Sequence, residues 1–349
     1  MSLKLKAKMA RAILYYNLKA KKLPYMPAIA SIELSGKCNY KCSFCPYHSE
    51  SDSILQKIKH EKLDMSFEDF KHLVDNYGYL MDDVDLVGNG EPLMHPEFEK
   101  FVKYLAEKGI KYRIITNGSL LTKKITEVFN KYPPTKITLS LYALDAERYK
   151  ELTKTGNLDI VLRNLDYFLE NNKNKIPVVL RSMNLPMFGY DEEINKIKDR
   201  YGHWENVFFS FSVLSSLGGK VDLEQYTKDV DSHICHNIYC TYPWTCVIIT
   251  ANTGVHICCN DADDKYNLGY LNKQSLKDIW NCDELLKIRE NIANGESYKN
   301  ARCVGCDIFN PEFSCEAPSS LFMFKRSFIN KTLMALGLRR NYDWTKYKK

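Results

Sequence analysis

The sequence predicts an α/β protein in which a partial (β/α)6 barrel is followed by a small, cysteine-rich α+β extension. Between residues 28 and 213, short apolar runs alternate with helical stretches. This alternation favours a parallel sheet covered by helices. Three of the twelve cysteines lie at positions 38, 42 and 45, and nine lie between 235 and 315. We therefore expect a barrel whose body lacks cysteine, flanked by two thiol-rich regions.

Six strands are expected, with helices between them. The predicted strands are residues 29–34, 84–87, 112–116, 136–141, 177–181 and 206–213. The predicted helices are residues 67–77, 96–108, a segment after Thr122, 146–171 with a break near Gly156, and 191–200. Ser66 and Thr122 are candidate N-caps, because a hydroxyl at that position can accept a hydrogen bond from the first helical turn.

The pattern changes after about residue 220. We expect a linker over 216–234, short strands near 247–250 and 254–257, and one helix over about 275–294. The domain boundaries that follow are an N-terminal arm at 1–28, the barrel at 29–215, a cysteine-rich domain at 235–315 and a C-terminal tail at 316–349.

Composition excludes several classes of protein. The chain has 349 residues, of which 45% are hydrophobic and 26% are charged, so it can bury a core. No apolar run approaches the roughly 18 residues of a membrane span, and no signal peptide is visible. We expect a soluble, cytoplasmic protein. In a reducing compartment, twelve thiols indicate metal binding rather than disulfides.

The two ends of the chain are basic. Residues 1–22 carry seven Lys or Arg and no acid, and residues 316–349 carry eight against two acids. Solvated ends would explain this charge. The alternative is attachment to an anionic surface or a lipid-linked substrate, because several apolar side chains roughly share a helical face: Leu3, Leu5, Met9, Ile13 and Leu14. No specific nucleic-acid partner is predicted.

Polar and glycine-rich groups follow the predicted strands. They are the first cysteine group, Gly88-Asn89-Gly90-Glu91-Pro92, Thr116-Asn117-Gly118, Ser140 and Arg181. The carboxyl ends of parallel strands meet at one edge of a barrel, where its chemistry lies. We therefore expect these residues to surround a single mouth.

Cys38, Cys42 and Cys45 form a C-x3-C-x2-C run after the first strand. Three such thiolates can hold three irons of a [4Fe–4S] cluster and leave the fourth iron open to a ligand. A zinc site is the alternative, with His48 as a fourth ligand.

This run, in this position, resembles that of the radical S-adenosylmethionine (SAM) superfamily, and the resemblance covers residues 29–213. It implies a TIM-like partial barrel in which Cys38, Cys42 and Cys45 ligate the cluster and the open iron chelates SAM. Phe44 would lie against the adenine. The residues Gly88, Asn89, Gly90 and Glu91 match the GGEP element of that family and would bind the methionine amino group, with glycines that let the ligand approach closely.

The resemblance also implies roles at three later strand ends. Asn117, Ser140 and Arg181 stand where the family contacts ribose or carboxylate, and a guanidinium can form a forked pair with a carboxylate. A structural ion pair is the other interpretation of Arg181. Tyr142 stands where many relatives carry Asp, which is a departure from the family pattern.

The second cysteine region resembles the SPASM/twitch extension of the same superfamily. The resemblance implies one auxiliary [4Fe–4S] cluster bound by Cys240, Cys258, Cys303 and Cys306, with Cys259 as the alternative to Cys258. A zinc site and unligated thiols are the other interpretations. A full SPASM pattern has more cysteines after Cys306, so a single auxiliary cluster is expected. Spare thiols would serve packing, or one could donate a hydrogen atom: Cys235, Cys246, Cys282 and Cys315.

Taken together, the resemblance implies an enzyme with two [4Fe–4S] clusters and SAM as cofactors. Such an enzyme reductively cleaves SAM to a 5′-deoxyadenosyl radical that abstracts a hydrogen atom from a C–H bond. We expect oxidation or epimerisation of a sugar-like small molecule, with a flavodoxin or ferredoxin as reductant. A peptide-modifying maturase is the second hypothesis, and a non-catalytic iron–sulfur electron carrier is the third.

Overall fold

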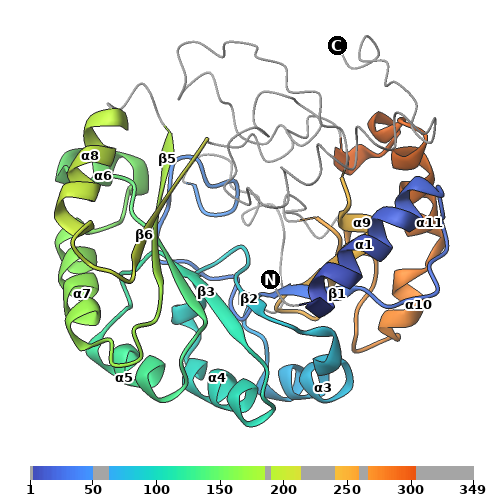
Figure 1. Ribbon diagram of the computed structural model, residues 1–349, viewed down its shortest axis with the longest axis horizontal. Helices are drawn as coiled ribbons and strands as arrows, with labels where there is room; N and C mark the ends of the chain where they lie inside the picture. Colours follow the sequence, from blue (N-terminus) through green and yellow to red (C-terminus); the bar gives the residue numbers. More distant parts are fainter. Residues whose placement is uncertain (1–2, 50–62, 185–189, 214–239, 259–265, 304–349) are drawn as a thin grey trace.

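The computed structural model describes residues 3–49, 63–184, 190–213, 240–258 and 266–303. Its centre is an 8-stranded sheet in the order β6-β5-β4-β3-β2-β1-β7-β8 (Figure 1). The strands are β1 Ala28–Ile32, β2 Val84–Leu86, β3 Tyr112–Thr116, β4 Lys136–Ser140, β5 Val178–Asn184, β6 Val207–Val213, β7 Cys246–Ile249 and β8 Val255–His256. Neighbouring strands are parallel, except that β7 and β8 are antiparallel.

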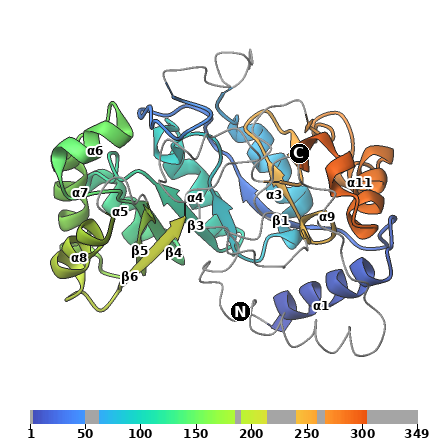
Figure 2. The same ribbon diagram turned by 90° about the horizontal axis from the view of Figure 1, so that it is seen from above.

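Helices form an arc outside β1 to β6, which confirms the predicted partial barrel (Figure 1). Helices α5 to α8 lie at one end of the molecule and α11 lies at the other (Figure 2). The α-helices are α1 Leu3–Asn17, α3 Phe67–Tyr77, α4 Phe98–Glu107, α5 Lys123–Lys131, α6 Ala146–Thr153, α7 Leu158–Asn171, α8 Tyr190–Tyr201, α9 Tyr242–Thr245, α10 Leu276–Trp280 and α11 Asp283–Ala293.

Local chemistry explains where several helices begin. The side chain of Ser66 accepts a hydrogen bond from the Asp69 amide at the start of α3. Thr122 does the same at the start of α5. The predicted break after α6 is present, and Asn157 caps α7 by accepting from the Ile160 amide. These positions confirm that short polar side chains set the helix starts.

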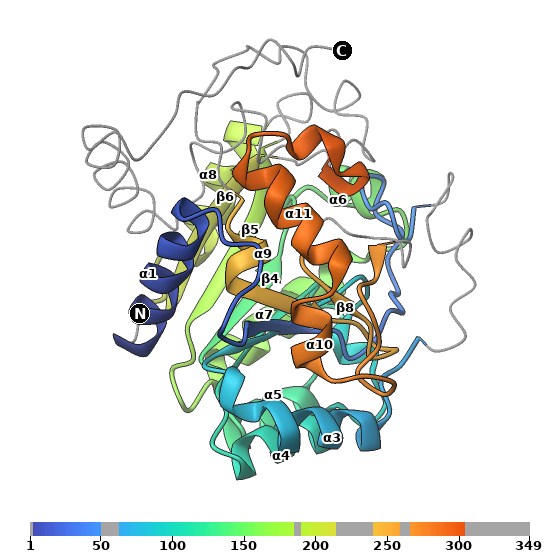
Figure 3. The same ribbon diagram turned by 90° about the vertical axis from the view of Figure 1, so that its right-hand side faces the viewer.

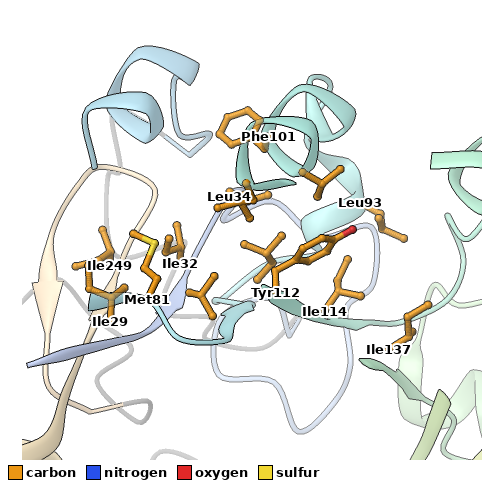
Figure 4. Close-up of a cluster of buried hydrophobic side chains, with 14 of the residues drawn as sticks. Ile29, Ile32, Leu34, Met81, Leu93, Phe101, Tyr112, Ile114, Ile137 and Ile249 are labelled. Atoms are coloured by element: carbon orange, nitrogen blue, oxygen red, sulfur yellow. The ribbon is translucent and has the colours of Figure 1, made fainter. Parts of the chain in front are cut away.

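The core is continuous from the barrel into the extension. Ile29 and Ile32 of β1, Ile114 of β3 and Ile137 of β4 are at most 2% exposed. Phe101 of α4 belongs to the same buried cluster, and Ile249 of β7 lies beside Ile29 and Ile32 (Figure 4). One apolar core therefore serves both parts of the chain.

Strand β7 is a finding that the sequence pattern did not predict. It was expected only as a short strand of the C-terminal extension, but it pairs in parallel with β1 and so extends the barrel sheet. Val247 and Ile249 are both fully buried. A parallel strand next to β1 buries both of its faces, which suits the apolar run Cys-Val-Ile-Ile.

The single helix expected over 275–294 is wrong, because the structure has two helices, α10 and α11, separated at Asn281 and Cys282. The Asn281 side chain accepts a hydrogen bond from the Leu23 amide and donates one to the Leu23 carbonyl. Arg289 also donates to Asn281. The hydrogen bonds to the distant Leu23 hold Asn281 between two helices instead of within one continuous helix.

The N-terminal arm packs on the extension. Helix α1 lies beside α9 (Figure 3). Tyr16 of α1 meets Trp244 of α9 edge-on, with 4.9 Å between ring centroids, and Ala12 is fully buried. Leu14, which was assigned to the apolar face, is 55% exposed. Within the described residues, no helix is both long and apolar enough to span a membrane.

Several predictions from the sequence fall outside the described residues. They are the linker over 216–234, the tail over 316–349, and the cysteines Cys235, Cys259, Cys306 and Cys315.

Candidate functional site

The three clustered cysteines lie on a loop after β1, and each is half-buried. This cysteine loop, residues 35–45, packs on the end of α6. The Lys41 amide donates to the Thr153 carbonyl at 3.2 Å, and the Ser43 amide donates to the Leu152 carbonyl at 2.9 Å. The loop backbone is therefore fixed by the protein itself.

The environment of the thiols opposes free thiolates. Burial raises the pKa of Cys38 to about 12, and it raises the pKa values of Cys42 and Cys45 as well. The neighbouring sulfurs of Cys45 and Cys38 add to the rise at Cys42. Thiolates here require a nearby positive charge, which metal ions supply.

A cluster and a single metal ion need different arrangements of donors. Among the described residues, no three His, Cys, Asp or Glu side chains are arranged to hold one metal ion. In a cluster each thiolate binds its own iron, so the three sulfurs need not converge on a single ion. His48 also points elsewhere, because its Nε2 donates to the Asn89 carbonyl at 3.0 Å. The Nε2 atom of His48, the fourth ligand in the zinc alternative, is thus already bonded to the protein.

Residues 88–92, the GNGEP loop, pack directly against the cysteine loop. The Glu91 amide donates to the Lys37 carbonyl at 2.7 Å. A methyl group on Gly90 would overlap with the backbone at Ser35 and Lys37, and one on Gly88 would overlap with the Glu33 side chain. Glycine is therefore required at both positions by the packing of the protein itself.

Glu91 is directed into the strand ends and is 3% exposed. Its carboxylate accepts hydrogen bonds from the Thr116 hydroxyl and the Asn117 amide, both at 2.7 Å, and from the Leu93 amide at 3.2 Å. Burial raises its pKa to about 7. The side chain therefore fixes the GNGEP loop to β3.

Asn89 and Asn117 lie on the two sides of this junction. The Asn89 backbone is held at both its amide and its carbonyl, while its side-chain amide makes no hydrogen bond within the part of the chain that the structure describes. The Asn117 side chain donates to Asn39 at 2.9 Å and lies 4.0 Å from the sulfur of Cys38. Asn117 thus packs directly against the cysteine loop.

Ser140 is the last residue of β4, but Arg181 lies within β5 and not at its end, because β5 continues to Asn184. Ser140 is the register partner of Arg181. Phe44 meets Tyr142 edge-on, with 5.1 Å between ring centroids. Burial raises the Tyr142 pKa above its usual value.

Arg181 is exposed, and within the described residues it has no ion-pair partner. The interpretation of Arg181 as a structural ion pair therefore finds no partner in that part of the chain.

The predicted auxiliary ligands are described only in part. Cys240 is buried, and Cys258 and Cys303 are half-buried. Of the spare thiols, Cys246 is buried at the start of β7 and its sulfur accepts from the Thr245 hydroxyl. Cys282 directly precedes α11, makes no side-chain capping hydrogen bond and packs against the core. Packing roles suit both.

Sequence reasoning missed Glu33, which directly follows β1 and is 5% exposed. Its carboxylate accepts hydrogen bonds from the amides of Asn89 and Ala251. An acidic residue inside the apolar run Ile-Glu-Leu was the available signal, because a buried carboxylate needs specific partners.

Residues 32–212 match the radical SAM superfamily, and residues 240–307 match SPASM, an iron–sulfur cluster-binding domain. The chain belongs to the radical SAM superfamily and carries a C-terminal SPASM domain. Its family therefore defines the site at the barrel mouth as one for SAM and a [4Fe–4S] cluster.

Individual relatives are more distant. The chain is 22% identical over 290 residues to the S-adenosyl-L-methionine-dependent 2-deoxy-scyllo-inosamine dehydrogenase of Niallia circulans, which covers 80% of this chain and 92% of that protein. It is 33% identical over 93 residues to an S-adenosylmethionine-dependent nucleotide dehydratase of Selenomonas ruminantium, 26% of this chain and 30% of that protein. The chain spans half or less of the first curated relatives that it matches.

Two solved structures share the fold. BtrN in complex with AdoMet and 2-DOIA has a TM-score of 0.54 at 18% identity, covering 84% of this chain and 98% of that one. SuiB of Streptococcus suis bound to the precursor peptide SuiA has a TM-score of 0.59 at 18% identity, covering 93% and 79%. Proteins of one fold thus appear with a small molecule and with a peptide.

Proposed function

We propose that this radical SAM enzyme is an oxidoreductase that oxidises or epimerises a sugar-like small molecule at a C–H bond. The observation that carries the proposal is the contact between the cysteine loop and the GNGEP loop at the carboxyl ends of β1 and β2, with Arg181 exposed on β5 of the same sheet. The 2-deoxy-scyllo-inosamine dehydrogenase that matches most of this chain supports the substrate class.

The three clustered cysteines are the proposed ligands of the first cluster. Cys38, Cys42 and Cys45 would bind the [4Fe–4S] cluster, and their burial keeps water from it. When bound, the cluster and SAM supply the electron and the 5′-deoxyadenosyl radical that takes a hydrogen atom from the substrate.

The mouth residues would orient SAM. The open side-chain amide of Asn89 suits the methionine end of SAM, and the Arg181 guanidinium suits a carboxylate. Phe44, held edge-on by Tyr142, would cover the adenine. Glu91 and Asn117 hold the two loops in place, so we assign them positioning roles.

The extension would contribute the second redox centre. Cys240, Cys258, Cys303 and Cys306 are the proposed ligands of one auxiliary [4Fe–4S] cluster, which could accept the second electron of an oxidation. A flavodoxin or ferredoxin is the proposed reductant. A peptide-modifying role is the alternative, supported by the fold shared with peptide-bound SuiB.

The test is the anoxic iron and sulfide content, with Mössbauer spectra, of the wild type and of the triple variant Cys38→Ala/Cys42→Ala/Cys45→Ala. We expect the triple variant to keep about four irons as one [4Fe–4S] cluster and to lose SAM cleavage. No remaining iron would contradict the auxiliary cluster. In the wild type, no 5′-deoxyadenosine under reducing conditions would instead support the electron carrier.

The substrate class needs its own measurement. Wild-type enzyme is incubated with SAM, dithionite and either a panel of aminocyclitols and sugars or a panel of peptides. Deuterium transfer from labelled substrate into 5′-deoxyadenosine identifies the class. Transfer from peptides alone would contradict the small-molecule proposal.

A further inference from the structure

Glu33 lies where the barrel and the SPASM domain share a sheet. Its amide donates to the Ile249 carbonyl at 2.8 Å, which continues the parallel pairing of β1 and β7 by one residue. Figure 4 shows Ile32, the preceding residue, beside Ile249. The side chain is 5% exposed, so its carboxylate depends on protein partners.

Each carboxylate oxygen of Glu33 is bound to a different part of the chain. Oε1 accepts from the Ala251 amide at 3.2 Å, in the turn between β7 and β8. Oε2 accepts from the Asn89 amide at 2.5 Å, in the GNGEP loop. One side chain therefore connects the SPASM hairpin to the loop proposed to bind SAM.

The geometry of the two donors explains why a carboxylate is present. Both partners are backbone N–H groups, so each needs an oxygen acceptor. Glutamine offers one oxygen and would turn its NH2 group toward the other N–H. An unpaired buried N–H is costly, so Gln cannot replace Glu without freeing one of the two segments.

The backbone of Asn89 is held by hydrogen bonds on both sides of its Cα. Its carbonyl accepts from His48 of the chain after the cysteines, while its amide is held by Glu33. A shift of the β7–β8 turn that moves the Glu33 carboxylate therefore displaces Asn89 as well.

We propose that Glu33 is a positioning residue that couples the β7–β8 hairpin of the SPASM domain to the GNGEP loop, so that order in the hairpin raises the affinity for SAM. The effect on SAM rests on the proposed function of that loop. The coupling itself rests on the hydrogen bonds of Glu33.

The experiment uses the reconstituted holoenzyme and a double-mutant cycle. Asn252→Ala loosens the hairpin turn, since the Asn252 side-chain oxygen accepts from the Thr250 hydroxyl and the Gly254 amide. It is combined with Glu33→Gln, and with Glu33→Ala where that variant folds. The readouts are amide hydrogen exchange over 87–91 and 249–252, the SAM dissociation constant, and the change that SAM causes in the electron paramagnetic resonance spectrum of the reduced cluster.

We expect Glu33→Gln to speed exchange in both segments and to weaken SAM binding about tenfold, with unchanged iron content. Asn252→Ala should speed amide hydrogen exchange over 87–91 when Glu33 is present. In the Glu33→Gln variant, it should cause no further increase in that exchange. Additive effects of the two substitutions would overturn the coupling. Coupled exchange with unchanged SAM affinity would instead overturn the assignment of SAM to the GNGEP loop.

Glu193→Gln is the control for the loss of a buried carboxylate. Glu193 is 3% exposed; its Oε2 accepts from the amides of Leu144 and Asp145, and its Oε1 accepts from Arg148 and Lys196. Its substitution should lower stability without changing exchange over 87–91 or 249–252. Faster exchange there in Glu193→Gln would show that general destabilisation, and not coupling, explains the Glu33 variants.

Discussion

At the scale of single residues, substitution of Arg181 should change ligand affinity without changing the stability of the fold. It is exposed and has no ion-pair partner within the described residues. We expect Arg181→Ala to weaken SAM or substrate binding by about 10- to 100-fold and to change the free energy of unfolding by less than about 0.5 kcal/mol. Equilibrium binding and urea unfolding measure the two effects. Arg163→Ala, an exposed arginine on α7, should change neither.

Glu91 predicts a dependence of stability on pH. Burial raises its pKa from an ordinary value near 4.5 to about 7. Between these values the folded protein keeps a proton that the unfolded chain releases, so this contribution to stability is present below about pH 4.5 and is lost as the pH rises through 7. We expect the wild-type apoprotein to lose roughly 2–3 kcal/mol relative to Glu91→Gln over that interval, as measured by urea unfolding. Parallel pH profiles of the two proteins would contradict this.

Individual residues also show which parts of the site the sequence could predict. The spacing of Cys38, Cys42 and Cys45 identified the loop, since ligands a few residues apart are necessarily close together. The same sequence also marked Gly88 and Gly90, but it did not show the packing that requires glycine there. Their neighbours are Glu33 and the backbone at Ser35 and Lys37, which only the folded chain brings there.

At the scale of elements, the contact between the GNGEP loop and the cysteine loop is testable through Gly90. In Gly90→Ala the new methyl group would overlap with backbone atoms, which cannot move as a flexible side chain can. We expect a loss of about 1–3 kcal/mol in the free energy of unfolding and weaker SAM binding. Denaturant unfolding and equilibrium binding check both.

Gly109→Ala is the control for that substitution. Gly109 has φ +67° with no atom within 4 Å of an added methyl group. Its cost should be about 1 kcal/mol from backbone conformation alone, with unchanged SAM affinity. If Gly109→Ala weakened SAM binding as much as Gly90→Ala, the contact between the two loops would not explain the loss.

Prediction of the elements succeeded where the deciding chemistry is local. The N-caps Ser66 and Thr122 each bind an amide three residues away. The helix over 275–294 was wrong because Asn281 is bound to Leu23, a residue 258 positions away. Helical periodicity continues across Asn281, so it gave no warning of the break.

At the scale of the whole molecule, Arg289 joins three distant segments. It is fully buried, and it donates to the carbonyls of Lys21, Pro243 and Trp280, each at 2.8 Å. Burial lowers its pKa to about 10, so it stays charged at neutral pH. The residue ties the N-terminal arm to the SPASM helices.

We expect Arg289→Met to lower the free energy of unfolding by about 3–5 kcal/mol, because three buried carbonyls lose their donor. Arg200→Met is the comparison, since Arg200 forms an exposed ion pair with Asp166 that contributes less than about 1 kcal/mol. Urea unfolding measures both, and equal losses would contradict the role of Arg289.

The sequence by itself determined the α/β alternation, most helix starts, the two cysteine groups and the membership of the radical SAM superfamily. Each of these depends on residue types within a few positions of one another, where spacing alone defines the chemistry. Only the tertiary structure decided that β7 pairs with β1, that Glu33 connects two loops and that Arg289 reaches Lys21 across 268 positions. Such partners are chosen by the packing of the whole core, because a buried polar group binds whichever donor or acceptor the fold brings to it.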